Sequence, residues 1–158
     1  ELLRISKESF DALSFNCYAL SPDHEKMNHA LEISGLQMII GEYHFGTVDR
    51  GLAQSLWQVN SQKERGDAFR YYTENAFAHR GLIGTGWFRW IDQNINGRTD
   101  GENYNCGFID VTDRPYPYMV DAAIEAAKSL YEIHSGTKTP FHQAPNAVGH
   151  SPIPDLWE

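Results

Sequence analysis

Stretches with strand character alternate along this chain with stretches of helical periodicity, and this order limits the possible folds more than any other feature. The predicted strands are residues 10–18, 36–45 and 82–90, and the predicted helices are 21–35, 61–78 and 117–134, after a helix end at residues 1–5. Such alternation is typical of α/β proteins, in which right-handed crossovers join parallel strands. The sequence therefore predicts one α/β domain with a parallel sheet, and 158 residues suit one domain.

The pattern inside two of the strands predicts their places in that sheet. Residues 36–45 form a nearly continuous apolar run, which is expected of a strand buried on both faces. Residues 10–18 alternate instead, so one face is apolar and the other polar. The apolar face holds Leu13, Phe15 and Cys17, and the polar face holds Ser14, Asn16 and Tyr18.

Helix-boundary residues mark where the first two full helices begin and end. Ser21 is predicted as an N-cap with Pro22 at the first helical position, and Gly35 as the glycine that ends the helix. Gly81 is predicted to close the helical stretch 61–78.

Composition excludes several classes of function. The net charge of −8 argues against nucleic-acid binding, and no apolar run reaches the roughly 20 residues of a membrane span. The first residues lack a signal-peptide pattern. Neither dinucleotide- nor phosphate-binding glycine motifs occur, so no cofactor is expected. Cys17 and Cys106 form no CxxC pair, so we expect buried apolar thiols rather than a zinc site, with a disulfide as the less favoured alternative.

The chain after the last helix differs in composition from the rest. Residues 136–158 contain four of the seven prolines and show no periodicity. They predict an extended tail, either wrapped over a surface or left loose, beside a folded domain of residues 1–135.

Polar residues gather where the first two predicted strands end. Asn16 and Tyr18 end one strand, and Glu42 and His44 end the other. Ligands of α/β proteins bind at the carboxyl ends of the strands, so Glu42 is either functional or held by a structural salt bridge or rim position. Tyr18 could donate its hydroxyl to Glu42 or be a core tyrosine. For His44 a structural role is favoured over ligand binding.

The third strand and the following loop add further candidates. Trp87 and Trp90 alternate in face, so both are not expected to line one pocket. The loop is read first as a solvated turn, with an arginine–carboxylate network or sugar contacts as alternatives. A calcium site is disfavoured because no EF-hand pattern is met. The loop candidates are Asp92, Gln93, Asn96, Arg98, Asp100, Glu102 and Asn103.

An ordered set of motifs resembles the family 50 glycoside hydrolases, the β-agarases. Residues 41–46 and 49–51 resemble the family's nucleophile strand, and residues 84–88 with 92–93 resemble its last barrel strand and loop. The other matching segments are 14–18, similar to the sixth strand, and 100–104, 107–113 and 115–116, similar to the stretch before the last helix. The resemblance covers roughly residues 1–135.

The resemblance implies a partial (β/α)8 barrel of about three βα units, the sixth to the eighth. A whole barrel needs about 250 residues, so roughly 90 are missing. Glu42 would be the nucleophile. The family's acid/base strand, with its Asn-Glu pair, has no counterpart here, and Gly86 stands where a histidine is expected. The implied substrate-binding residues are Asn16, Tyr18, His44, Trp87, Asp92, Gln93, Arg98, Glu102 and Asn103.

Three hypotheses follow. The chain is a fragment of a retaining glycoside hydrolase for β-galactosides such as agar oligosaccharides, inactive until a complementary barrel fragment completes it. Alternatively, it is a non-catalytic carbohydrate-binding or vestigial half-barrel that forms a homo-oligomer, since open sheet edges favour pairing. The third hypothesis is an unrelated α/β domain in which Glu42 is structural. Carbohydrate is the expected partner in the first two.

Overall fold

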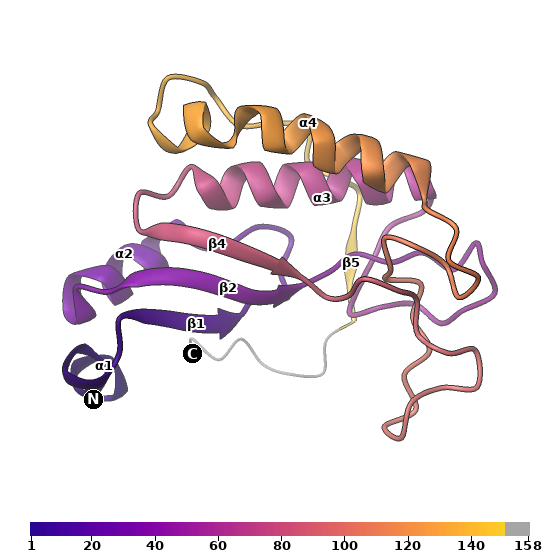
Figure 1. Cartoon of the computed structure of the whole chain (residues 1–158), viewed down its shortest axis with the longest axis horizontal. Coiled ribbons are helices and arrows are strands. Elements are labelled where there is room, and N and C mark those ends of the chain that lie inside the picture. Colours follow the sequence, from indigo (N-terminus) through magenta and orange to yellow (C-terminus); the bar gives the residue numbers. More distant parts are fainter. Residues whose placement is uncertain (151–158) are drawn as a thin grey trace.

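The computed structural model describes residues 1–150, so the last eight residues of the predicted tail lie outside the described part. Three parallel strands form the central sheet in the order β1-β2-β4, as the alternating sequence predicts. Figure 1 shows their carboxyl ends at one end of the molecule, where the long loops gather. The elements are α1 (Leu2–Ser9), β1 (Ala12–Asn16), α2 (His24–Ser34), β2 (Gln37–Tyr43), β3 (Trp57–Gln58), α3 (Gln62–Phe77), β4 (Leu82–Trp87), α4 (Pro117–His134) and β5 (Val148–Gly149).

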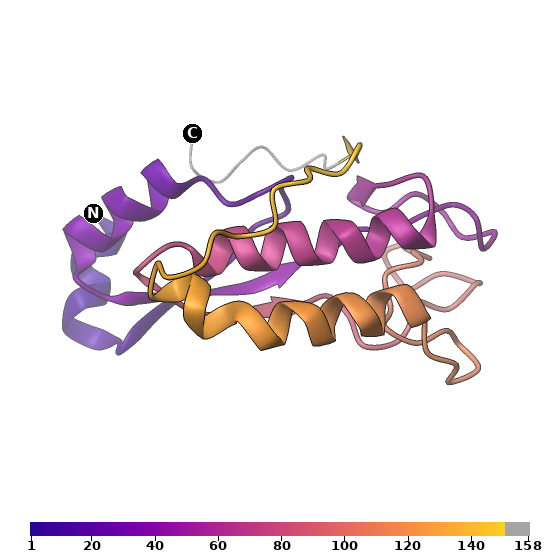
Figure 2. The same ribbon diagram turned by 90° about the horizontal axis from the view of Figure 1, so that it is seen from above.

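Helices cover one side of this sheet. Met38 and Ile40 of β2 are fully buried in a core shared with Met27 of α2 and Tyr72 of α3. The helix α4 runs alongside α3 (Figures 1 and 2). The two helices approach closely at Gly66, where a β-carbon would lie 2.5 Å from the carbonyl oxygen of Tyr118. The apolar residues of β2 therefore serve the helix-covered face.

An extra residue in β2 changes the direction of its side chains. Phe15 of β1 pairs with Ile40, but the next residue, Asn16, pairs with Glu42. The pairing with β4 shows the same interruption between Ile40 and Tyr43. A bulge of this kind offsets the alternation of faces. Tyr43 consequently packs toward α3, stacked on Tyr72 with ring centroids 4.0 Å apart, and Glu42 leaves the face that holds Ile40.

The helix boundaries differ from the prediction at two places. Asp23 rather than Ser21 caps α2, because its carboxylate accepts the backbone N–H groups of Glu25 and Lys26. Gly81 does not end α3, which stops at Phe77. Gly81 instead precedes β4, where a β-carbon would lie 2.9 Å from a methyl group of Leu31. Gly35 does end α2 in the left-handed conformation, as predicted.

The described part of the tail wraps over the helices. Figure 2 shows the chain leaving α4, crossing α3 and ending at β5, which pairs antiparallel with β3. Residues 136–150 are called the strap below.

Cys17 and Cys106 are buried thiols that form no disulfide. Burial raises the pKa of Cys106 to about 12, so the thiol stays protonated and unreactive. In residues 1–150 no helix has the length and apolar character needed to cross a membrane.

The bulge explains why residue 86 is a glycine. A β-carbon there would lie 2.4 Å from the carbonyl oxygen of Gly41, closer than real β-carbons come to backbone atoms. We expect Gly86→Ala to lower the free energy of unfolding by about 1–3 kcal/mol, because the strands must separate to admit the methyl group. Chemical denaturation of the purified chain measures this.

Gly84→Ala is the matched control in the same strand. Its β-carbon would meet only a side chain, Ile39, at 3.7 Å, an ordinary van der Waals contact. Equal destabilisation by the two substitutions would contradict the steric role of Gly86.

Candidate functional site

Tyr18 and Glu42 meet at the carboxyl end of the sheet. The Tyr18 hydroxyl donates a hydrogen bond of 2.8 Å to Oε2 of Glu42, the contact suggested by the sequence. Both residues are partly buried. Burial, followed by the hydrogen bond to the Glu42 carboxylate, raises the pKa of Tyr18 far above its usual value. The phenol therefore stays protonated at physiological pH and remains a donor to the carboxylate.

Asn16 lies beside this pair on the open face of the sheet. It is exposed and is the register partner of Glu42 in β1. A β-carbon on Gly41 would come within 2.9 Å of the Asn16 side-chain oxygen, which shows that the amide reaches across to the bulge. The absence of a side chain at residue 41 leaves room for Asn16 next to Glu42.

His44 is buried and engaged by backbone on both sides. Its Nδ1 lies 3.1 Å from the carbonyl oxygen of Phe88, and its Nε2 accepts the N–H of Leu56 at 3.1 Å. The ring therefore carries its proton on Nδ1 and has no nitrogen left for a sugar. It meets the Tyr18 ring of the site in an edge-to-face contact, with centroids 4.9 Å apart. The structure thus favours the structural role for His44.

Asp92 and Gln93 are also structural in their contacts. Asp92 is buried and accepts hydrogen bonds from Asn105 Nδ2, the Gly107 backbone N–H and the Tyr116 hydroxyl. Gln93 is buried and accepts the backbone N–H of Tyr104 at 2.7 Å. These side chains hold the loop together rather than pointing a free polar atom outward.

Asn103 likewise binds backbone. Its side-chain oxygen accepts the N–H of Ala53 at 3.3 Å, and its amide lies 3.4 Å from the carbonyl oxygen of Ile95. It thereby ties the loop after β4 to the loop after β2.

Arg98 and Glu102 form a partly exposed network at the loop surface. Arg98 pairs with Asp100 at 2.9 Å and with Glu102 at 3.3 Å, and its guanidinium lies 5.7 Å from the centre of the Phe88 ring. Glu102 also accepts the Gln93 amide at 2.7 Å. The negative charge of Glu102 makes a small contribution to the raised pKa of Tyr18, after burial and the Glu42 carboxylate.

The same contacts bear on the calcium alternative. The oxygens of Asp100 and Glu102 already bind Arg98. Among residues 1–150, no three histidine, cysteine or acidic side chains are close enough to hold a metal ion.

Trp87 points to the core rather than to the open face. Its ring packs edge-on against Tyr43 and Phe69, at centroid distances of 5.2 and 5.5 Å, and its N–H donates to the carbonyl oxygen of Cys106. Trp90 is 68% exposed and stacks on Phe108. Phe88, next to Trp87 in sequence, has its ring tilted against that of His44 with centroids 5.9 Å apart, and sequence reasoning missed it. Its alternation with Trp87 was the available signal.

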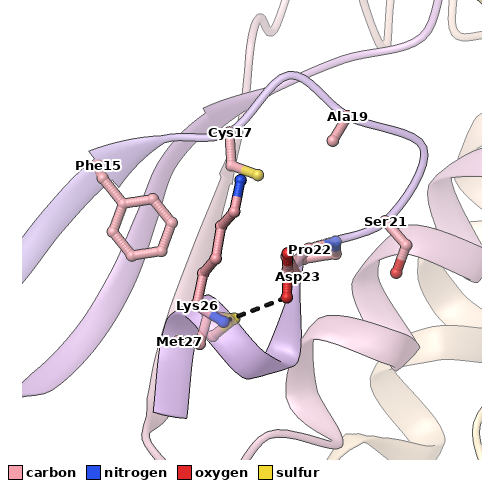
Figure 3. Close-up of a pocket in the computed structure, with 8 residues that line it drawn as sticks. All are labelled: Phe15, Cys17, Ala19, Ser21, Pro22, Asp23, Lys26 and Met27. Carbon is pink, nitrogen blue, oxygen red and sulfur yellow. Dashed lines mark hydrogen bonds between the residues drawn. The ribbon is translucent and has the colours of Figure 1, made fainter. Parts of the chain in front are cut away.

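A hollow under β1 lies away from these residues. It is lined by Phe15 and Cys17 from the end of β1 and by Lys26 and Met27 from α2 (Figure 3). Its volume is about 50 Å³, far below the few hundred cubic ångströms of a typical ligand pocket. The dashed contact in Figure 3 is the Asp23 cap of α2. This hollow is too small for a sugar ring.

Comparison with known proteins relates the chain to agarases. No family model matches it. It is 38% identical to β-agarase A and 36% identical to β-agarase B, both from Vibrio sp. (strain JT0107), over 128 residues in each case. The match covers 77% of this chain but 13% of each relative, so the chain spans about an eighth of their length.

Solved structures agree with this relationship. An exo-β-agarase matches with a TM-score of 0.79 at 35% identity, covering 84% of this chain and 18% of that one. Another agarase matches with a TM-score of 0.79 at 36% identity, covering 84% and 21%. A β-glucuronidase from Faecalibacterium prausnitzii, 18% identical with a TM-score of 0.54, shares the fold over 78% of this chain and 23% of its own.

The burial of His44 predicts an acid-sensitive stability. Burial lowers its pKa from 6.5 to about 3, against the raising effect of the Phe88 carbonyl. As the pH falls, His44 is therefore protonated near pH 6.5 in the unfolded chain but only near pH 3 in the folded chain. The neutral His44 ring therefore contributes fully to the free energy of unfolding above pH 6.5. This contribution falls as the pH drops from 6.5 toward 3, and about 2 kcal/mol of it is lost at pH 5.

Urea denaturation at pH 7.5 and pH 5 tests this. We expect His44→Gln to remove about 2 kcal/mol of the pH dependence, whereas His29→Gln, at an exposed position of α2, leaves it unchanged. An unaltered pH dependence in His44→Gln would show that the ring titrates normally.

Proposed function

Because the chain is a β-agarase-like segment of glycoside hydrolase family 50, we propose that it supplies the nucleophile side of a retaining glycoside hydrolase site. The substrates proposed are β-galactosides such as agar-type oligosaccharides. The Tyr18–Glu42 hydrogen bond at the carboxyl end of the central strand carries this proposal.

The fold proposed is the sixth to eighth βα units of a (β/α)8 barrel. Support comes from three parallel strands in sequential order with helices on one face. Residues 1–135 would form this partial barrel domain and residues 136–158 its tail. A barrel closes only when its first and last strands pair, so the outer edges of β1 and β4 would receive the missing strands.

Glu42 is the proposed nucleophile. Its carboxylate is partly exposed and accepts the Tyr18 hydroxyl on Oε2, so the other oxygen, Oε1, would be the one that attacks an anomeric carbon. Attack forms a covalent glycosyl-enzyme, and water then releases the sugar with retention. Tyr18 would hold the carboxylate in position throughout the two steps.

The acid/base residue is proposed to come from elsewhere. Retention requires a second carboxyl group about 5–5.5 Å from the first to protonate the leaving oxygen. Glu74 stands next to an asparagine, as the family's acid/base does, but in the reverse order, Glu74-Asn75. It is buried on α3 and paired with Arg70 at 2.5 Å, so it does not fill this role. The chain alone would therefore be inactive.

The other candidate site residues divide into those proposed to contact the sugar and those that hold the contacting residues in place. Asn16, Tyr18, Arg98 and Glu102 keep partly exposed polar groups, and we propose them as contacts for sugar hydroxyls. The others would act by holding these residues in place, through the backbone and core contacts described above. The supporting set is His44, Trp87, Asp92, Gln93 and Asn103.

A second candidate function rests on the open sheet edges. Beside β1 lies an apolar groove of about 360 Å³ lined by Leu3, Leu13 and Phe15. Beside β4 lies another of about 480 Å³, lined by Ile83 and Tyr131 among others. Unpaired edges of this kind favour strand addition. The chain would then be a carbohydrate-binding half-barrel that self-associates.

The catalytic proposal predicts activity only after completion. We expect the purified chain not to hydrolyse an aryl β-galactoside, and its complex with a polypeptide carrying the first five βα units of a related β-agarase to do so. Glu42→Gln should lower that rate by roughly a thousandfold or more, because the covalent intermediate cannot form. Turnover is followed by release of the aryl group.

Glu32→Gln, an exposed change on α2, should leave the rate of the complex unchanged. Hydrolysis by the chain alone would contradict the missing acid/base, and full activity of the Glu42→Gln complex would contradict the nucleophile.

The self-association proposal predicts a native mass of about twice the 18.0 kDa of one chain. It also predicts that this dimer binds agar oligosaccharides without hydrolysing them. Leu13→Lys should shift the mass toward the monomer, because it places a charge in the groove beside β1. Light scattering after size exclusion measures the mass. Val111→Lys, at an exposed loop position, is the control, and a monomer at all concentrations would exclude this second function.

A further inference from the structure

The Cys17–Tyr18 segment is held by contacts from three different parts of the chain. The Cys17 N–H donates to the backbone carbonyl of Glu42 at 2.9 Å, and the Tyr72 hydroxyl donates to the Cys17 carbonyl at 2.7 Å. The indole N–H of Trp57 donates to the Tyr18 carbonyl at 2.8 Å. Since β1 ends at Asn16, no sheet pairing holds Tyr18 itself, and the indole provides its backbone anchor.

Trp57 is in turn held by the strap. Trp57 pairs with Gly149 across the β3–β5 ladder, and the N–H of His150 donates to the Leu56 carbonyl at 2.7 Å. A β-carbon on Gly149 would lie 3.0–3.3 Å from three atoms of the Trp57 ring, so the strap backbone lies directly on the indole. On another side, the ring meets Phe45 edge-on at 6.4 Å.

A clamp on α3 fixes the strap before it reaches Trp57. The Phe141 N–H donates to the buried Glu74 carboxylate at 2.7 Å, and the Phe141 carbonyl accepts the Asn75 amide at 3.0 Å. The Arg70 guanidinium, which pairs with Glu74, lies 4.6 Å from the centre of the Phe141 ring. Figure 2 shows the strap crossing α3 on its way from this clamp to β5.

The segment under the strap also reaches the second neighbour of Tyr18. The N–H of Leu56 is the donor to His44 Nε2, and the His44 ring supports the Tyr18 ring by its edge. One short segment, Leu56 and Trp57, thus holds Tyr18 both through its backbone and through its ring.

We propose that Trp57 is a positioning residue for the site, and that the strap keeps its indole directed at Tyr18 so that the Tyr18 hydroxyl stays on Glu42. The strap is then part of the site's scaffold, although none of its residues is proposed to touch a sugar. This inference rests on the proposed function only in treating Glu42 as the reacting group.

The hydroxyl proton of Tyr18 reports the contact directly. In the full chain its NMR signal is identified by its loss in Tyr18→Phe, and its exchange with solvent is then measured. Trp57→Phe removes the N–H donor but keeps an aromatic ring against Phe45. We expect it to speed exchange of the Tyr18 hydroxyl proton at least tenfold, and Gly149→Val, which crowds the indole, to do the same.

Two matched substitutions serve as controls. Trp90→Phe makes the same chemical change at an exposed tryptophan, and Val148→Ala alters an exposed side chain in the same strand as Gly149. Both should leave the exchange rate within twofold, with circular dichroism confirming that all variants are folded. If Trp57→Phe does not fold, Gly149→Val decides alone.

An exchange rate for Tyr18 in the folded Trp57→Phe or Gly149→Val variant equal to that of the unaltered chain would overturn the proposal. Because the readout is a proton of this chain and not hydrolysis, it stands apart from the test of catalysis. A chain without glycosidase activity in any complex could still show the predicted exchange, and an active complex could fail to show it.

Discussion

The extra residue that β2 carries opposite both neighbouring strands is the constraint on which the rest of the site depends. Strict alternation would put Glu42 on the same face as Met38 and Ile40, which are fully buried under the helices. A carboxylate there would be desolvated without a partner, at a cost of several kcal/mol. The bulge turns Glu42 to the open side, and the neighbouring backbone then approaches so closely that Gly86 must lack a side chain.

A buried polar network supports the loops around this point. Arg65, fully buried on α3, donates to the carbonyl oxygens of Asn105 and Gly107 and lies 4.4 Å from the centre of the Tyr116 ring. Burial lowers the pKa of Arg65, and the charge of Asp92 opposes that effect. Such a network favours this loop arrangement, because moving the two carbonyl groups away would take hydrogen-bond acceptors from a buried guanidinium. Loops without regular structure thereby become a defined rim for the site.

The sequence predicted the architecture well where local pattern decides. The three strands, their parallel order and the Gly35 helix end follow from hydrophobic periodicity and turn chemistry, and the structure confirms them. The Tyr18–Glu42 contact was one of two alternatives for Tyr18, and it could be named because neighbouring parallel strands bring their carboxyl ends together. The cap of α2 was misplaced by two residues, since Ser21 and Asp23 are both good caps and only the backbone geometry selects between them.

Side chains that bind distant backbone were the hardest to interpret. His44 contacts the backbone of Phe88 and of Leu56, which lie in two other segments. The hydrogen-bond partners of Asp92 lie 13 to 24 residues away in the sequence. Nothing in the local sequence distinguishes such a residue from one that faces a ligand. The direction of the Trp87 ring was open for a related reason, because its face depends on which side of β4 the helices cover.

By itself, the sequence determined that this chain builds a parallel α/β sheet and brings a glutamate and a tyrosine to the same end of it, since periodicity and strand order are local properties. The tertiary structure alone decided which way Glu42 points and what holds Tyr18 there. Those answers depend on one extra residue in β2, and on a strap that returns from α4 to lie on Trp57. Contacts between segments so far apart in the chain form only when the whole fold brings them together.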